Sequence, residues 1–73
     1  MSFGQVKEYQ PHQLRVFDEE TALCQKIVAL EAFLESDRFD SLPKDERFRL
    51  RIQLSAMKLY QEILLDRIAA FGA

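Results

Sequence analysis

The chain contains one cysteine, one histidine, no tryptophan, two glycines and two prolines among its 73 residues. The lone cysteine, Cys24, cannot form an internal disulfide, so the cross-linked framework of small secreted domains is excluded and a reducing cytoplasm is expected. One histidine and one cysteine also fall short of a structural zinc site. On one continuous helix His12 and Cys24 would lie about 18 Å apart, too far for a nucleophile and its base. We therefore expect no metal, no cofactor and no enzymatic activity.

Excess positive charge and long apolar runs are missing as well. Ten Lys and Arg residues stand against twelve Asp and Glu, a formal net charge of −2, so the cationic surplus that holds DNA or RNA is absent. The longest apolar stretches, such as residues 27–30, are about four residues long, whereas a membrane span needs about 20. With 48% hydrophobic residues the chain is too apolar for disorder. These properties predict one small soluble domain that binds neither nucleic acid nor membrane.

The two prolines divide the chain into an arm and two helices. Residues 1–10 show no helical period and are expected to form an N-terminal arm. Pro11 suits the first position of a helix, and Pro43, followed by two acidic residues, repeats that signal. The sequence predicts an all-α antiparallel hairpin with a helix over 11–36, a turn over 37–42 and a helix over 43–71. A short turn would set His12 level with Arg67.

Each expected helix carries apolar residues on two sides rather than on one. At about 100° per residue, Val16, Leu23 and Ile27 share one side of the first helix, while Leu54 and Leu64 share one side of the second. Two helices can cover only one such stripe each, so the second stripes would expose several hundred Å² of apolar surface. We therefore expect a homo-oligomeric helical bundle. Its expected interface residues are Phe17, Val28, Phe48, Ile52, Leu59 and Ile63. An alternative is that this face docks on a different protein.

A cationic cluster is expected where the two helix ends meet. The predicted ligand-binding residues are Tyr9, His12, Arg15, Tyr60 and Arg67. An arginine guanidinium matches phosphate oxygens, the first-turn N–H groups of a helix attract anions, and a tyrosine ring can stack on a base. The simpler alternative is that the arginines make ordinary surface ion pairs with nearby acids and that the histidine is solvated.

Three other features are expected to be structural. Basic residues between Lys44 and Arg51 begin the second helix. We expect them to be solvated and to pair with acidic residues one helical turn away. Ligand binding at this cluster stays an alternative. Phe39 is expected to plug the turn. Cys24, on an apolar stripe, is expected to be a small buried side chain.

Several segments together resemble a known protein family. The most specific are Tyr-Gln-Pro-His-Gln-x-Arg-Val at residues 9–16 and Ala-Met-x-x-Tyr at residues 56–60. The remaining matches are 31–37, Ser41-Leu42-Pro43, Gln53-Leu54, Ile63 and Arg67. Over about residues 9–71 the chain resembles a family of small helical proteins of tailed phages, including crAss-like phages, to which no function is assigned. The resemblance directs attention to Tyr9, Pro11, His12, Arg15, Met57, Tyr60 and Arg67, and it implies the cytoplasm of an infected host as the location.

In size, two-helix form and phage origin the chain is also similar to phage counter-defence sponges. These small helical oligomers sequester the nucleotide signals of CBASS or Thoeris immunity, and this likeness carries no residue across. Our leading hypothesis is therefore an oligomer that captures a cyclic dinucleotide or an ADP-ribose derivative at subunit junctions. The alternative is a helical interaction module, a phage adaptor or inhibitor that binds a host protein and no small ligand.

Overall fold

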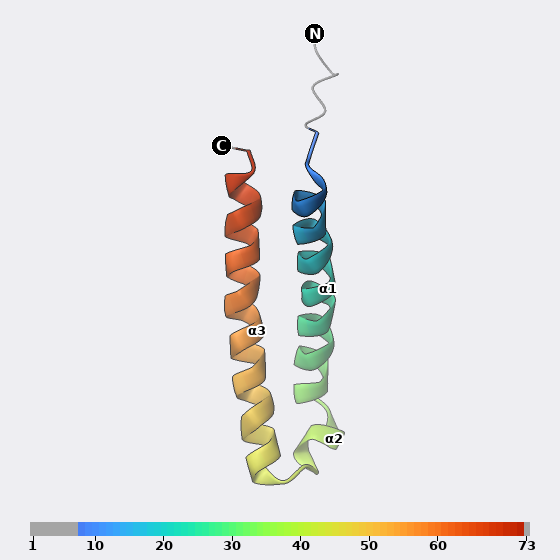
Figure 1. Cartoon of the computed structure of the whole chain (residues 1–73). Helices are drawn as coiled ribbons and strands as arrows, with labels where there is room; N and C mark the ends of the chain where they lie inside the picture. Colours follow the sequence, from blue (N-terminus) through green and yellow to red (C-terminus); the bar gives the residue numbers. More distant parts are fainter. Residues whose placement is uncertain (1–7, 73) are drawn as a thin grey trace.

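The computed structural model describes residues 8–72, and the regular secondary structure within that range is helical throughout (Figure 1). They are α1 (Pro11–Leu34), α2 (Asp37–Asp40) and α3 (Lys44–Ala70). The two long helices run antiparallel beside each other, and α2 occupies the connection between them. The all-α hairpin is therefore confirmed. Most of the expected arm, residues 1–7, lies outside the described residues, and residues 8–10 belong to no helix.

The first helix begins where the sequence predicts and ends two residues earlier. At its start the backbone N–H of Gln10 donates to Oε1 of Gln13 at 2.7 Å, just ahead of Pro11. At its end the hydroxyl of Ser36 donates to the carbonyl oxygen of Phe33 at 2.6 Å. The same hydroxyl accepts a hydrogen bond from the backbone N–H of Phe39 at 3.3 Å. Ser36 thus closes α1 and caps α2, which is why α1 cannot continue through it.

The segment predicted to be a plain turn contains α2, a single helical turn. Its Phe39 is 2% exposed and packs edge-on against Phe33, with ring centroids 6.1 Å apart. The guanidinium carbon of Arg51 lies 5.0 Å from the centroid of the Phe39 ring. Burial of this ring offsets the cost of ordering the connection, so the prediction that Phe39 plugs the turn is confirmed.

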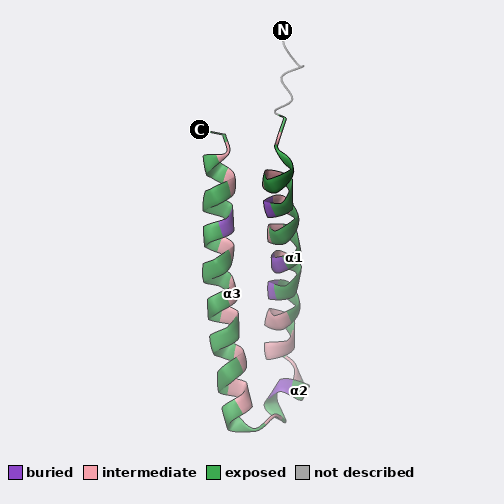
Figure 2. Cartoon of the chain, in the orientation of Figure 1, coloured by how far each residue is buried: buried purple, intermediate pink, exposed green. Residues whose placement is uncertain are grey.

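The core lies between α1 and α3 and follows the first stripe of each helix. Its buried residues are Val16, Leu23, Ile27 and Leu64, and Leu54, Met57, Ile68 and Phe71 pack against them. Where the α3 stripe is interrupted by Gln61, the side-chain amide lies 3.5 Å from a carboxylate oxygen of Glu20. Figure 2 shows buried and half-buried positions on the facing sides of the helices and exposed positions elsewhere.

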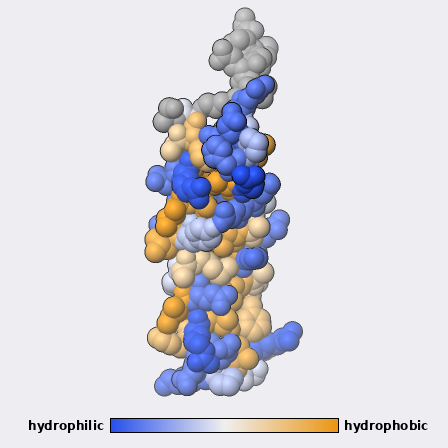
Figure 3. Space-filling view, viewed as in Figure 1, coloured by the Kyte–Doolittle hydropathy of each residue, from blue (hydrophilic) through white to orange (hydrophobic). Residues whose placement is uncertain are grey.

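The second stripe of α3 is exposed, and apolar patches recur along the surface (Figure 3). Five of the six expected interface residues are at least half exposed, namely Val28 (60%), Phe48 (62%), Ile52 (52%), Leu59 (60%) and Ile63 (51%). The sixth, Phe17, is half-buried inside the hairpin. Cys24 is half-buried too, on the side of α1 away from the core residues Val16, Leu23 and Ile27, so its burial against a second chain stays a prediction.

The register of the hairpin differs from the prediction. With His12 level with Arg67, Phe17 would be level with Glu62; instead the Phe17 ring packs against Phe71, with centroids 5.9 Å apart. The physical reason is α2, which lengthens the connection, so that α3 extends beyond the end of α1 at the turn (Figure 1). His12 therefore lies nearer the C-terminal end of α3 than predicted.

Candidate functional site

An aromatic cluster closes the open end of the hairpin, where α1 begins and α3 ends. Tyr9, just before α1, packs edge-on against Phe17 with centroids 4.9 Å apart and lies 6.3 Å from Phe71. Tyr9 is half-buried in this contact. Its ring therefore holds the chain entering α1 against the end of α3, and only its outer part is available to a ligand. This structural role of Tyr9 was not anticipated from the sequence, because it depends on Phe71 coming back across the hairpin.

The predicted cations lie on the surface of the same two helices. His12 and Arg15 are exposed on the first turns of α1, and Arg67 is exposed on the last turn of α3. Within residues 8–72 the side chains of these three residues make no hydrogen bond or ion pair. The alternative in which both arginines pair with neighbouring acids is therefore not what the structure contains. Their donors point into solvent, where an anion can reach them.

Tyr60 stands apart from that end of the molecule. It is 41% exposed on α3 and, seven residues before Arg67, lies about 10 Å from it along the helix axis. Among the described residues no hydrogen bond, ion pair or ring contact joins any two of the five predicted ligand-binding residues. One chain thus does not bring the five side chains into contact with one another, and Tyr60 in particular lies away from Arg67 along α3.

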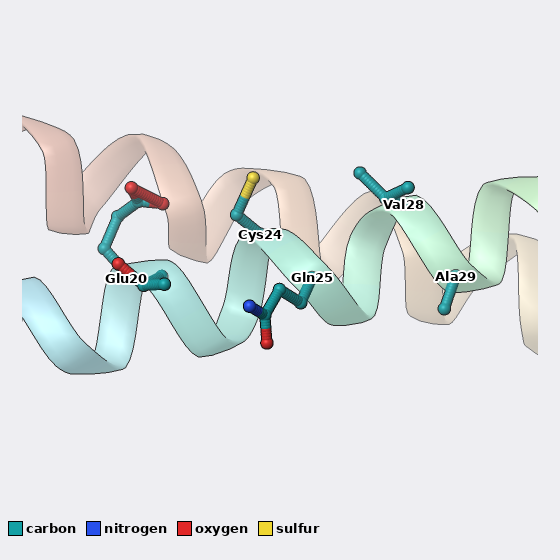
Figure 4. A pocket seen from close by; sticks show the side chains of 6 residues that line it. Glu20, Cys24, Gln25, Val28 and Ala29 are labelled. Atoms are coloured by element: carbon teal, nitrogen blue, oxygen red, sulfur yellow. The ribbon is translucent and has the colours of Figure 1, made fainter.

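Among the hollows on the surface of residues 8–72, two lie along α1, and neither suits an anion. The first is lined by α1 alone, and in Figure 4 Cys24 and Val28 point to one side of the helix while Gln25 and Ala29 point to another. It is therefore an open depression rather than a pocket, and Glu20 lines it as well. The second hollow crosses from α1 to Leu54 and is lined by two carboxylates; its residues are Val28, Glu31, Ala32, Leu34, Glu35 and Leu54. This hollow was missed from the sequence because it depends on the register between the helices.

The basic residues at the turn end are mostly engaged within the chain. Arg49 pairs with Glu46, Nε to Oε1, at 2.9 Å, which agrees with the expected surface partner one turn away. Arg51 lies over the Phe39 ring. Nε of Arg47 is buried and has no hydrogen-bond partner among the described residues, a feature with no signal in the sequence. This cluster is therefore a weaker candidate for an anion than the open end.

One ion pair crosses between the long helices. Nζ of Lys58 lies 2.8 Å from Oε2 of Glu31, and the two side chains are 51% and 44% exposed. Exposed pairs contribute about 0–1 kcal/mol because water screens them. We expect Lys58→Ala to lower the free energy of unfolding by less than about 1 kcal/mol in urea denaturation, with the difference shrinking in high salt. A larger loss that persists in salt would show that Lys58 packs rather than pairs.

Two general findings bear on the kind of site. No helix within the described residues is long and apolar enough to cross a membrane. Over the same residues, His, Cys, Asp and Glu side chains nowhere gather in a group of three or more that could hold a metal ion.

Comparison with known proteins places the chain among small phage proteins. A family model described as Sequestin matches residues 10–70. A 7.5 kDa protein from the denB-rIIB intergenic region of Enterobacteria phage T4, described as uncharacterized, is 43% identical over 60 residues, covering 82% of this chain and 94% of that protein. No solved structure matches. The resemblance to a family of small phage proteins is thereby confirmed.

Proposed function

Because the chain belongs to the Sequestin family, we propose that it sequesters a small anionic ligand, specifically a nucleotide immune signal such as a cyclic dinucleotide or an ADP-ribose derivative. The family name denotes sequestration and names no ligand. The observation that carries the proposal is the group of exposed cations at the open end, which make no ion pair within residues 8–72. Unneutralised donors beside the first turn of a helix favour phosphate groups.

Each predicted residue has a role in this capture. Arg15 and Arg67 hold phosphates through their guanidinium groups, and His12 donates a further hydrogen bond alongside the first-turn N–H groups of α1. Tyr60, or the outer part of Tyr9, stacks on a base. The chain acts by stoichiometric binding rather than by catalysis, so the signal should be recovered chemically unchanged after the protein is denatured.

The binding sites lie between copies of the chain. In one copy Tyr60 lies about 10 Å from Arg67 along α3, and the two hollows described along α1 are each lined by at least one carboxylate. Two or more copies can bring such groups together and exclude water from the phosphate contacts, which strengthens them. The exposed apolar stripe on α3 supports such self-association.

Thermal denaturation with a panel of nucleotides tests the proposal. The panel contains cyclic dinucleotides, cyclic ADP-ribose isomers and linear ADP-ribose, with AMP as a simple phosphate control. A ligand at about one hundred times its dissociation constant stabilises the folded state by about 2.7 kcal/mol, which is several degrees for a domain of this size. A shift with a signal nucleotide and none with AMP is the expected result. The absence of a shift across the panel would contradict the proposal.

A second candidate function is favoured by the same exposed stripe. A helical interaction module would bury this face against a different protein rather than against itself. The two functions separate in affinity purification from host lysate. A sequestering oligomer returns alone or with a nucleotide, whereas an adaptor or inhibitor returns with a protein in fixed stoichiometry.

A further inference from the structure

Contacts between the two long helices fix which of their residues lie at the same height. Three pairs of side chains meet across the hairpin, namely Phe17 with Phe71, Glu20 with Gln61, and Glu31 with Lys58. In an antiparallel hairpin the numbers of two residues at one height add up to a constant, and these pairs give 88, 81 and 89. At the mean of 86, Lys26 lies level with Tyr60, and Glu19 lies level with Arg67.

Helical periodicity places Lys26 and Tyr60 on the same flank of the hairpin. The ion pair between α1 and α3 marks one flank, and each of its members comes one residue after a position that faces the other helix. Lys26 and Tyr60 instead come one residue before such positions, which are Ile27 and Gln61. At about 100° per residue, one step forward and one step back lead to opposite flanks. Lys26 and Tyr60 therefore share the flank opposite the ion pair.

The two flanks differ in charge. The flank of the ion pair carries the carboxylates of Glu20, Glu31 and Glu35, which line the hollows along α1. Over residues 12–26 and 60–67 the opposite flank, which we call the basic flank, gathers cations from both helices. By the same periodicity its titratable members beside Tyr60 are His12, Arg15, Glu19, Lys26 and Arg67. Three fixed positive charges thus stand against one carboxylate, in a chain whose formal net charge is −2. An anion is therefore attracted to the basic flank rather than to the other.

Lys26 has a charge that nothing nearby in the chain neutralises. It is exposed, and within residues 8–72 its side chain makes no hydrogen bond or ion pair. The residues one helical turn away on α1, at positions 22, 23, 29 and 30, are all alanine or leucine, so no carboxylate pairs with its ammonium group there. Lys58 differs, because Glu31 lies 2.8 Å from its Nζ. Lys26 therefore offers a cation level with the Tyr60 ring, which is 41% exposed.

We propose that Lys26 is a further ligand-binding residue, which holds a phosphate of the nucleotide whose base stacks on Tyr60. This inference rests on the proposed function and adds to it the place of the base on a single hairpin. The ligand then follows the basic flank toward Arg67, about 10 Å away along α3, where a second phosphate is held. The site therefore favours a nucleotide with at least two phosphate groups over a monophosphate. In the proposed oligomer a second copy closes over this half-site rather than creating it.

Calorimetric titration with ADP-ribose and with cyclic di-AMP tests the role of Lys26. Lys26→Gln should weaken the binding of either nucleotide by about tenfold or more, because it removes a charged hydrogen bond to phosphate. Lys26→Arg keeps the charge and should retain most of the affinity. Lys58→Gln is the matched control, since it removes a lysine from the opposite flank and should leave binding unchanged. Unchanged binding by Lys26→Gln would overturn the assignment of Lys26 while leaving nucleotide capture intact.

Labelling with pyridoxal phosphate tests the basic flank without a nucleotide. The aldehyde of this probe forms an imine with a lysine amine and releases water, and its phosphate is attracted to neighbouring cations. Borohydride reduction then fixes the adduct for mass spectrometry. Lys26 should be labelled ahead of Lys44 and Lys58, and inorganic pyrophosphate should protect it. Equal labelling of the three lysines would refute the anion site on this flank. Preferential labelling of Lys26 with no response to any nucleotide would instead refute the proposed function and leave the anion site standing.

Discussion

Replacing Leu64 with alanine is expected to lower the free energy of unfolding by about 2–5 kcal/mol. Leu64 is 0% exposed and lies in the buried cluster with Val16, Leu23 and Ile27. The truncation removes apolar contacts and leaves a cavity that straight, paired helices cannot close by a small shift. A single core in a chain of this size rarely supplies more than about 3–5 kcal/mol, so the variant should lose most of its stability.

Leu65→Ala is the control for that substitution, because it removes the same atoms one residue away. Leu65 is 48% exposed, so truncating it should cost far less than truncating Leu64. Urea denaturation followed by circular dichroism measures both variants, at one protein concentration because association stabilises the folded state. Equal losses for the two variants would mean that α3 is rotated about its axis relative to the structure.

Reversing the charge of both open-end arginines is expected to abolish nucleotide binding. A hydrogen bond to a charged group contributes about 1.5–3 kcal/mol, so loss of one such contact should weaken binding by about 10- to 150-fold. The Arg15→Glu and Arg67→Glu double variant loses both contacts and adds repulsion of the phosphates. Because neither side chain makes an ion pair within residues 8–72, the folded state itself should be little affected.

Arg38→Glu serves as the control for reversing an arginine elsewhere on the chain. Arg38 is an exposed arginine on α2, at the other end of the hairpin. Isothermal titration with the nucleotide that gives the largest thermal shift should show normal binding for this control and none for the double variant. Normal binding by the double variant would move the site away from the open end. Loss of binding in the control as well would indicate a general effect of net charge.

Much of the fold follows from local signals in the sequence. Pro11 and Pro43 stand at the two helix starts, and the periodic apolar residues separate into a stripe that is buried and, on α3, a stripe that is exposed. These features depend on backbone geometry and on periodicity within a single helix. Both can be read without knowing how the helices meet.

The errors share one cause, which is the connection between the helices. Serine is common in turns, yet the Ser36 hydroxyl forms hydrogen bonds both with the end of α1 and with the start of α2. The helical turn that results shifts α3 along α1. A shift of a few residues leaves the stripes facing each other but changes every pairwise contact between the helices. For that reason the core was predictable, whereas the neighbours of His12 and Arg67 were not.

The sequence by itself determined two helices, the side on which each is buried and the surplus apolar side of α3, because these follow from periodicity and capping along one chain. Only the tertiary structure decided the register and the packing of Tyr9 between Phe17 and Phe71. Those features depend on contacts between residues far apart in sequence, whose geometry is set by how the connection packs around Phe39.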